Sequence, residues 1–420
     1  TRDRRRHGLA RRAPQPAAPI ERIAFSAIVS TTPDQVAVAP GTLEREWIAQ
    51  ERRYFHYRSE GAVPNEYAIA SARYAVRNER WQDVAIDAYF DPAHADNAQR
   101  LVRGAGAVLD YGTRQFGPYG QHDLRLVETP RGTGPSRGFP GMLALPENGA
   151  FIARLDPGAG GSARGSIDYP FYMGAWTTAH QWWKRQPGGA LLADTLAEYT
   201  ALMAVRASSG APAMRRYLRE DQRAYLLGRA LATRREQPLT ATVDEPWLRQ
   251  RKGGLALYLL QDLLGEERVN TVLRGLVMQA GARAPDMAAL AAALRAAAPP
   301  DKAYLVRDLF EDIVLYENRA DSASARLRPD GKYEVTLQAS AAKVRAGAPN
   351  EQNLALADYI DFGVDDRAGN PLARERRRVS SGAQTITFVV AGRPGRAGID
   401  PDYKLIDKKP TDNMVVVDNR

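Results

Sequence analysis

The chain contains no cysteine, which excludes disulfide bonds and thiolate metal sites but no cellular compartment. It also lacks any uninterrupted apolar run of membrane-spanning length, so the sequence predicts no transmembrane helix. Histidine occurs only five times, and His7, His56, His94 and His122 are scattered singly. We interpret these four as surface or core residues, which leaves His180 as the histidine that lies within a motif.

What the chain does contain is typical of a soluble globular protein. Its 420 residues are 44% hydrophobic and 25% charged, enough for two or three domains with sizeable cores. The net charge is +9, and the first twelve residues include six arginines. A basic arm can bind nucleic acid or anionic lipid. Because no nucleic-acid-binding signature accompanies it, we interpret residues 1–20 as a solvated, irregular connector and expect no nucleic-acid partner.

The most informative stretch runs from Trp176 to Tyr199. Two helices are predicted here, separated by the helix-breaking sequence P-G-G. The first reads W-T-T-A-H-Q-W-W and carries His180, and the second reads L-A-D-T-L-A-E-Y and carries Asp194 and Glu198. The two acids are four residues apart, so they can share one helix face.

This stretch resembles the zinc core of the aminopeptidase N family of metallopeptidases, the gluzincins. In that family H-E-x-x-H-Q-W-W is followed by a second helix that reads L-x-E-x-x-A-E-Y. A narrower resemblance is to the extracytoplasmic peptidase-like domain fused to bacterial ABC transporter permeases, whose second helix reads T-E-S-L-A-E-Y-S-A-L-M. Residues 193–203 read A-D-T-L-A-E-Y-T-A-L-M.

The resemblance implies a zinc site in which two histidines and a glutamate bind the metal and a second glutamate acts as general base. Here Trp176 stands at the first histidine position and Thr177 at the general-base position. His180 keeps the second histidine position. The sequence L-A-D-T-L-A-E-Y assigns the third ligand position to Asp194, whereas the number of residues that separates it from His180 favours Glu198. The site is therefore degenerate, and these last three residues are its residual metal-ligand candidates.

Two more stretches resemble functional motifs of the family. Glu147 and Asn148 end a segment similar to the edge strand that carries the family's G-x-M-E-N motif, whose glutamate receives the substrate's α-amine. The alternative is a turn with a solvated glutamate, since Pro146 and Gly149 are turn formers. Gln250 stands where the family has the tyrosine of Y-x-K-G, which stabilises the oxyanion, and an amide can donate a hydrogen bond there.

The overall pattern predicts an α+β multidomain fold. After the arm at residues 1–20, alternating short runs over residues 21–80 predict the end of an N-terminal β domain. The resemblance implies that residues 81–320 form a gluzincin-like, zincin-type α/β domain with a helical half. Residues 325–420 alternate as strands and predict a C-terminal, Ig-like β-sandwich.

Two functions follow from the resemblance. Because Trp176, Thr177 and Gln250 are changed together, the first is a non-catalytic peptidase-like domain without a cofactor, which binds a peptide or protein. Its expected place is the extracytoplasmic face of the bacterial inner membrane, with an ABC transporter permease segment upstream of this chain. The second is an atypical zinc metallo-aminopeptidase that uses the reduced ligand set. The zinc content of the purified protein distinguishes these two functions.

Overall fold

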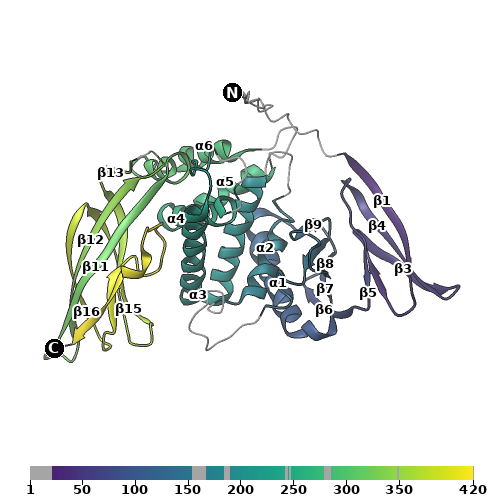
Figure 1. Ribbon diagram of the computed structural model, residues 1–420, viewed down its shortest axis with the longest axis horizontal. Helices are drawn as coiled ribbons and strands as arrows, with labels where there is room; N and C mark the ends of the chain where they lie inside the picture. The colour runs from purple at the N-terminus through teal and green to yellow at the C-terminus, as the bar shows by residue number, and fades with distance from the viewer. Residues whose placement is uncertain are drawn as a thin grey trace, which may run out of the picture.

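A computed structural model describes residues 21–153, 167–183, 190–241, 245, 247–278, 285–347 and 350–419 (Figure 1). The basic arm predicted at residues 1–20 lies outside the described residues. The elements follow one another along the longest axis of the molecule, from a small β unit, through a helical centre, to a large curled sheet. The candidate site lies between the first two of these parts.

The N-terminal β unit consists of two small antiparallel sheets. One has the order β1-β4-β3 and the other pairs β2 with β5. The strands are β1 (Arg22–Thr31), β2 (Val36–Val38), β3 (Thr42–Ala49), β4 (Arg52–Pro64) and β5 (Ala70–Ala72). Alternation along β1 and β4 buries Phe25, Phe55 and Tyr57 in a core of their own.

A five-stranded mixed sheet follows, in the order β6-β7-β8-β10-β9. Its strands are β6 (Ala75–Trp81), β7 (Val84–Phe90), β8 (Asp123–Thr129), β9 (Arg137–Phe139) and β10 (Met142–Pro146). β8 is parallel to both β7 and β10, while β6 and β9 are antiparallel edge strands. Because β6 pairs with β7, this sheet begins before residue 80, where the sequence predicted the domain boundary.

Helices α1 (Ala95–Phe116) and α2 (Tyr169–Ala179) pack on this sheet and on each other. η1 (Pro92–His94) leads into α1, which is the crossover from β7 to its parallel neighbour β8. The two helices cross at glycines. A Cβ added at Gly104 would lie 1.9 Å from the carbonyl oxygen of Phe171, and one at Gly174 would lie 2.0 Å from that of Leu101. Only glycine permits this backbone contact.

The remaining helices form the centre of the molecule. They are α3 (Ala190–Leu231), the π-helical η3 (Leu248–Lys252), α4 (Gly253–Leu264), α5 (Glu266–Met278), α6 (Met287–Ala297), α7 (Tyr304–Val306) and the π-helical η4 (Arg307–Glu311). α3 is kinked at Gly210, which has a φ of 75° and lies two residues before Pro212. No described helix has both the length and the apolar character needed to cross a membrane.

The C-terminal strands form one curled, eight-stranded sheet. Its order is β13-β12-β11-β18-β17-β14-β15, and β16 also pairs with β12. The elements are β11 (Val314–Leu327), β12 (Tyr333–Arg345), β13 (Gln352–Leu354), β14 (Ala357–Asp365), β15 (Pro371–Ser380), β16 (Gly382–Val390), β17 (Arg396–Ile399), η5 (Pro410–Asp412) and β18 (Met414–Asn419). The structure confirms a mixed, multi-sheet α+β architecture. The zincin-like and Ig-like details stay predictions.

Candidate functional site

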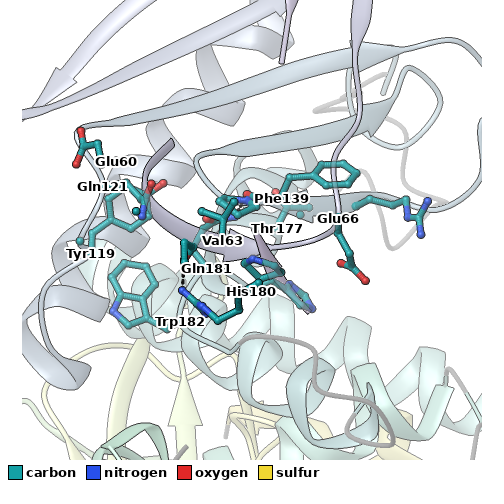
Figure 2. A pocket seen from close by; sticks show the side chains of 18 of the residues that line it. Glu60, Val63, Glu66, Tyr119, Gln121, Phe139, Thr177, His180, Gln181 and Trp182 are labelled. Atoms are coloured by element: carbon teal, nitrogen blue, oxygen red, sulfur yellow. Dashed lines mark hydrogen bonds between the residues drawn. The ribbon is translucent and has the colours of Figure 1, made fainter. Parts of the chain in front are cut away.

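A cavity of about 490 Å³ lies between the end of β4 and the end of α2. Its wall comes from β4 and the segment after it, from the loops around residues 118–121 and 136–140, and from residues 176–182. Figure 2 shows Val63 of the β4 side across from Thr177, His180 and Gln181. The degenerate motif therefore lies in the wall of a cavity.

Both ring nitrogens of His180 are already engaged. Nδ1 lies 2.9 Å from the carbonyl oxygen of Trp176, and Nε2 lies 3.1 Å from Oδ1 of Asp194. Asp194 is fully buried in α3. A carbonyl oxygen can only accept, so Nδ1 carries a proton and donates it, and a second proton on Nε2 would make the contact with Asp194 an ion pair. Asp194, which the local sequence favoured as the third ligand position, is thus in contact with His180, and its role as a metal ligand stays a prediction.

The two altered positions of the first helix contribute no metal ligand and no base. The Trp176 indole packs against the His180 ring, with ring centroids 4.4 Å apart and planes at 71°. The Thr177 hydroxyl is buried and donates to the carbonyl oxygen of Met173 at 2.6 Å. Neither side chain offers a carboxylate or an imidazole to the cavity.

Glu198 points to a different place from Asp194. Its Oε2 accepts a hydrogen bond of 2.5 Å from the Tyr172 hydroxyl, and its Oε1 lies 3.7 Å from Nη1 of Arg251. The same Nη1 lies 2.6 Å from Oδ1 of Asp221. We call these four residues, Tyr172, Glu198, Asp221 and Arg251, the buried acid cluster. Burial, and then the Asp221 carboxylate, raise the pKa of Glu198 well above its ordinary value.

The three residual metal-ligand candidates are therefore divided between two places. His180 and Asp194 meet at the cavity end of α2, whereas Glu198 lies in the buried acid cluster near the other end. Among the described residues, no group of three histidine and acidic side chains is arranged to hold a metal ion. A catalytic zinc normally has three protein ligands, so the residues present do not fit it.

Glu147 and Asn148 lie outside the cavity wall. They follow β10 in a turn, where Oε1 of Glu147 accepts a hydrogen bond of 2.6 Å from Nε of Arg131. β10 lies between β8 and β9, so it is not the edge strand that the resemblance implied. Gln250 lies in η3 and is not part of the cavity wall either. The structure does not bring these three residues to His180.

Gln181 and Trp182, which the family motif places directly after its second histidine, line the cavity. Nε2 of Gln181 donates to the carbonyl oxygen of Phe139 at 3.2 Å, and Nε1 of Trp182 donates to that of Gly117 at 3.0 Å. They fix the end of α2 to the two wall loops. Glu60 and Glu66, on the opposite wall, had no local signal in the sequence because they come from a separate β unit.

Among the comparisons with known proteins, the one with solved structures gave a match. No family model matches the chain, and no curated protein does. Among solved structures, the crystal structure of Legionella pneumophila aminopeptidase A in complex with aspartic acid matches with a TM-score of 0.57 at 12% identity. The match covers 93% of this chain and 45% of that one, so this chain spans less than half of that protein.

This chain has a peptidase-like fold. At 12% identity the likeness shows the fold alone. Membership of the gluzincin family in particular stays a prediction from the motifs around His180.

Proposed function

We propose that this chain is a non-catalytic, peptidase-like domain that binds a peptide or protein segment in the cavity beside His180. The observation that carries the proposal is the combination of an open cavity with an absent reaction centre. The cavity of about 490 Å³ is of the size that small ligands occupy. Its wall holds Trp176 and Thr177 where an active relative would hold a metal ligand and a base.

The wall offers groups that suit a peptide. Gln181 supplies an amide, Phe139 and Trp182 supply aromatic surface, and Glu60 and Glu66 supply carboxylates on the opposite side. Such a mixture of apolar surface with a few polar groups is typical of binding pockets. Peptide binding requires no metal ion, general base or oxyanion donor. A chain that lacks these catalytic groups can therefore still bind a peptide.

The proposal includes the wider context that the resemblance implies. We propose a domain of the gluzincin type that acts beside an ABC transporter permease on the extracytoplasmic side of a bacterial inner membrane. The sequence of residues 193–203, A-D-T-L-A-E-Y-T-A-L-M, supports this assignment. The peptidase-like fold is compatible with it and does not test the permease or the location.

Filling the cavity tests the binding function. Gly61 lines the cavity, and a Cβ added there would meet no atom within 4 Å, so Gly61→Trp is compatible with the fold. Gly275, on α5 outside the cavity, has equally open space and gives the matched control Gly275→Trp. Peptides selected from a random display library against the wild-type chain should bind Gly61→Trp at least about tenfold more weakly. Equal binding to both variants would exclude the cavity as the site.

Zinc content and hydrolysis test the non-catalytic character. After dialysis against micromolar zinc, we expect no stoichiometric metal and no cleavage of aminoacyl reporter substrates above background. The control is His180→Ala. About one zinc per chain, together with hydrolysis that this variant loses, would instead establish the atypical metallo-aminopeptidase.

A further inference from the structure

A buried lysine lies where the helical centre meets the curled C-terminal sheet. Nζ of Lys343, on β12, lies 2.6 Å from Oδ2 of Asp308 on η4 and 2.9 Å from Oδ2 of Asp358 on β14. The three residues are only 4%, 5% and 2% exposed, in that order. We call them the buried lysine triad. One amine thus has two carboxyl groups in contact with it and little access to water.

The two carboxyl groups of the triad differ in their other ionic contacts. Oδ1 of Asp308 lies 3.5 Å from Nε of Arg307, whose side chain is 56% exposed. In the described part of the chain, the ion pair of Asp358 is the one with Lys343. Two acids therefore face two bases, and the charges balance. They stay balanced if Lys343 and Asp358 neutralise each other, because Asp308 keeps Arg307.

The surroundings of the triad are aromatic. The Tyr316 hydroxyl donates a hydrogen bond of 2.7 Å to Oδ2 of Asp358. Burial, and then the Asp358 carboxylate, raise the pKa of Tyr316 well above its ordinary value, so the hydroxyl keeps its proton and stays a donor. The rings of Tyr304 and Tyr316 have centroids 5.2 Å and 6.0 Å from Nζ of Lys343. Such surroundings penalise separated charges.

We propose that Lys343 and Asp358 are joined by an intramolecular isopeptide bond, an amide between Nζ and Cγ, and that Asp308 carries the protons of the reaction. The reaction condenses an ammonium group with a carboxylate and gives one amide and one water molecule. It requires no oxidant, reductant or co-reactant. The bond forms within the folded chain from the three side chains that the fold has brought together.

Each group has one part in the reaction. The Asp308 carboxylate accepts a proton from the Lys343 ammonium, and the free amine attacks Cγ of Asp358, where the C–N bond forms. The Tyr316 hydroxyl donates to the oxygen on which negative charge develops. Asp308 passes its proton on, a C–O bond breaks, and that oxygen leaves as water with two of the three ammonium protons. The third proton stays on the amide nitrogen, and Asp308 ends as a carboxylate beside Arg307.

Two effects favour the amide at this place. The fold holds the amine against the carboxyl group, and positioning of this kind corresponds to an effective concentration of about 10⁵ M or more. The reaction also replaces two buried charges, which are costly to desolvate, by a neutral group. A structural ion pair needs only one carboxylate beside the ammonium, whereas the condensation needs a second one as proton carrier.

The bond would close the curl of the C-terminal sheet. In the strand order, β12 and β14 are separated by β11, β18 and β17, so the amide connects strands that are not neighbours. The chain has no cysteine and therefore no disulfide bond. An isopeptide bond gives it a covalent crosslink that reducing conditions do not break.

Mass spectrometry of the purified, denatured full chain tests the bond. We expect the mass of the wild-type chain to lie below the mass of its sequence by one water molecule. Trypsin should leave Lys343 uncleaved and release residues 333–345 joined to residues 346–367. An unchanged mass, or a water lost at any other pair of residues, would overturn the proposal. Because this measurement uses the wild-type chain, it does not depend on the folding of a variant.

A pair of lysine variants identifies the nucleophile. Lys343→Arg removes the amine and should give a chain with the full mass of its sequence. The matched control is Lys302→Arg, because Lys302 is a partly buried lysine outside the triad whose Nζ donates to the carbonyl oxygen of Leu263 at 2.6 Å. This control should keep the loss of one water. The same loss in Lys343→Arg would place the crosslink elsewhere and overturn the proposal.

Variants of Asp308 test the proton carrier on folded monomer isolated by gel filtration. Asp308→Asn keeps the shape but cannot accept the proton, so we expect the linked fraction of chains to fall about tenfold or more. Asp308→Glu keeps a carboxyl group and should retain most of the linkage. Complete linkage in Asp308→Asn would exclude Asp308 from the reaction.

Discussion

The two clusters that join α2 to α3 differ in their balance of acids and bases. At the cavity end, one histidine meets one aspartate, His180 with Asp194. At the other end, Glu198 and Asp221 share one guanidinium, that of Arg251. The first cluster thus holds one acid for one base, whereas the second holds two acids for one base. The likeness to peptidases led to the first cluster, whereas counting charges leads to the second.

Removing the shared guanidinium should give the largest effect on stability. Arg251→Met leaves two buried carboxyl groups without their cation, and breaking a buried pair in this way costs about 3–5 kcal/mol. Urea unfolding measures the loss. The matched control is Arg223→Met, which removes a half-exposed arginine from Glu220 and should cost less than about 1 kcal/mol. Similar losses in the two variants would mean that Arg251 contributes only as a surface charge.

Breaking the balanced pair should cost somewhat less. His180→Ala leaves the Asp194 carboxylate buried without its imidazole, and we expect a loss of about 2–4 kcal/mol. The second change, Asp194→Ala, should then add little in the His180→Ala background, because the two residues act together. A double-mutant cycle of unfolding free energies measures this coupling. Additive losses would show that the 3.1 Å contact is not the interaction that matters.

The imbalance in the buried acid cluster predicts a pH dependence of stability. The pKa of Glu198 is raised in the folded state, so folding takes up a proton. Its contribution is complete below about 4.5, the ordinary pKa, and is lost as the pH rises through the folded pKa. The groups that face it are Tyr172 on α2, Asp221 on α3 and Arg251 on η3.

Glu198→Gln removes this titration while keeping an acceptor for Tyr172. Compared with the variant, the wild-type unfolding free energy should therefore fall more steeply with pH, by up to about 1.4 kcal/mol per unit. Denaturant unfolding at a series of pH values above 4.5 measures both slopes. Parallel slopes would mean that Glu198 keeps its ordinary acidity in the folded protein.

The smallest effect is expected at Glu147. Its partner Arg131 is 66% exposed, so Glu147→Ala should change the unfolding free energy by less than about 0.5 kcal/mol. Because Glu147 lies outside the wall of the cavity, affinity for selected peptides should also stay within about twofold of wild type. A tenfold loss restricted to peptides with a free amine would instead support the role that the family motif assigns to this glutamate.

The sequence predicted those features that depend on neighbouring residues. Alternating runs over residues 21–80 predicted the strands of the N-terminal β unit, and the sequence from Trp176 to Tyr199 predicted two helices, which correspond to α2 and α3. It did not predict the acid cluster, since Asp221 and Arg251 reach Glu198 only through helix packing. The position of Glu147 depends on which strand lies at the sheet edge, and strand order is not a local property.

The glycine crossing of α1 and α2 gives the cavity one stiff wall and one compliant wall. Gly104 and Gly174 bring the two backbones into contact, so α2 cannot shift without moving α1 and the sheet beneath it. The facing wall, at residues 60–64 of β4, rests on the separate and smaller core around Phe55. If the cavity binds ligands of different bulk, we therefore expect the β unit to be displaced while His180 keeps its place.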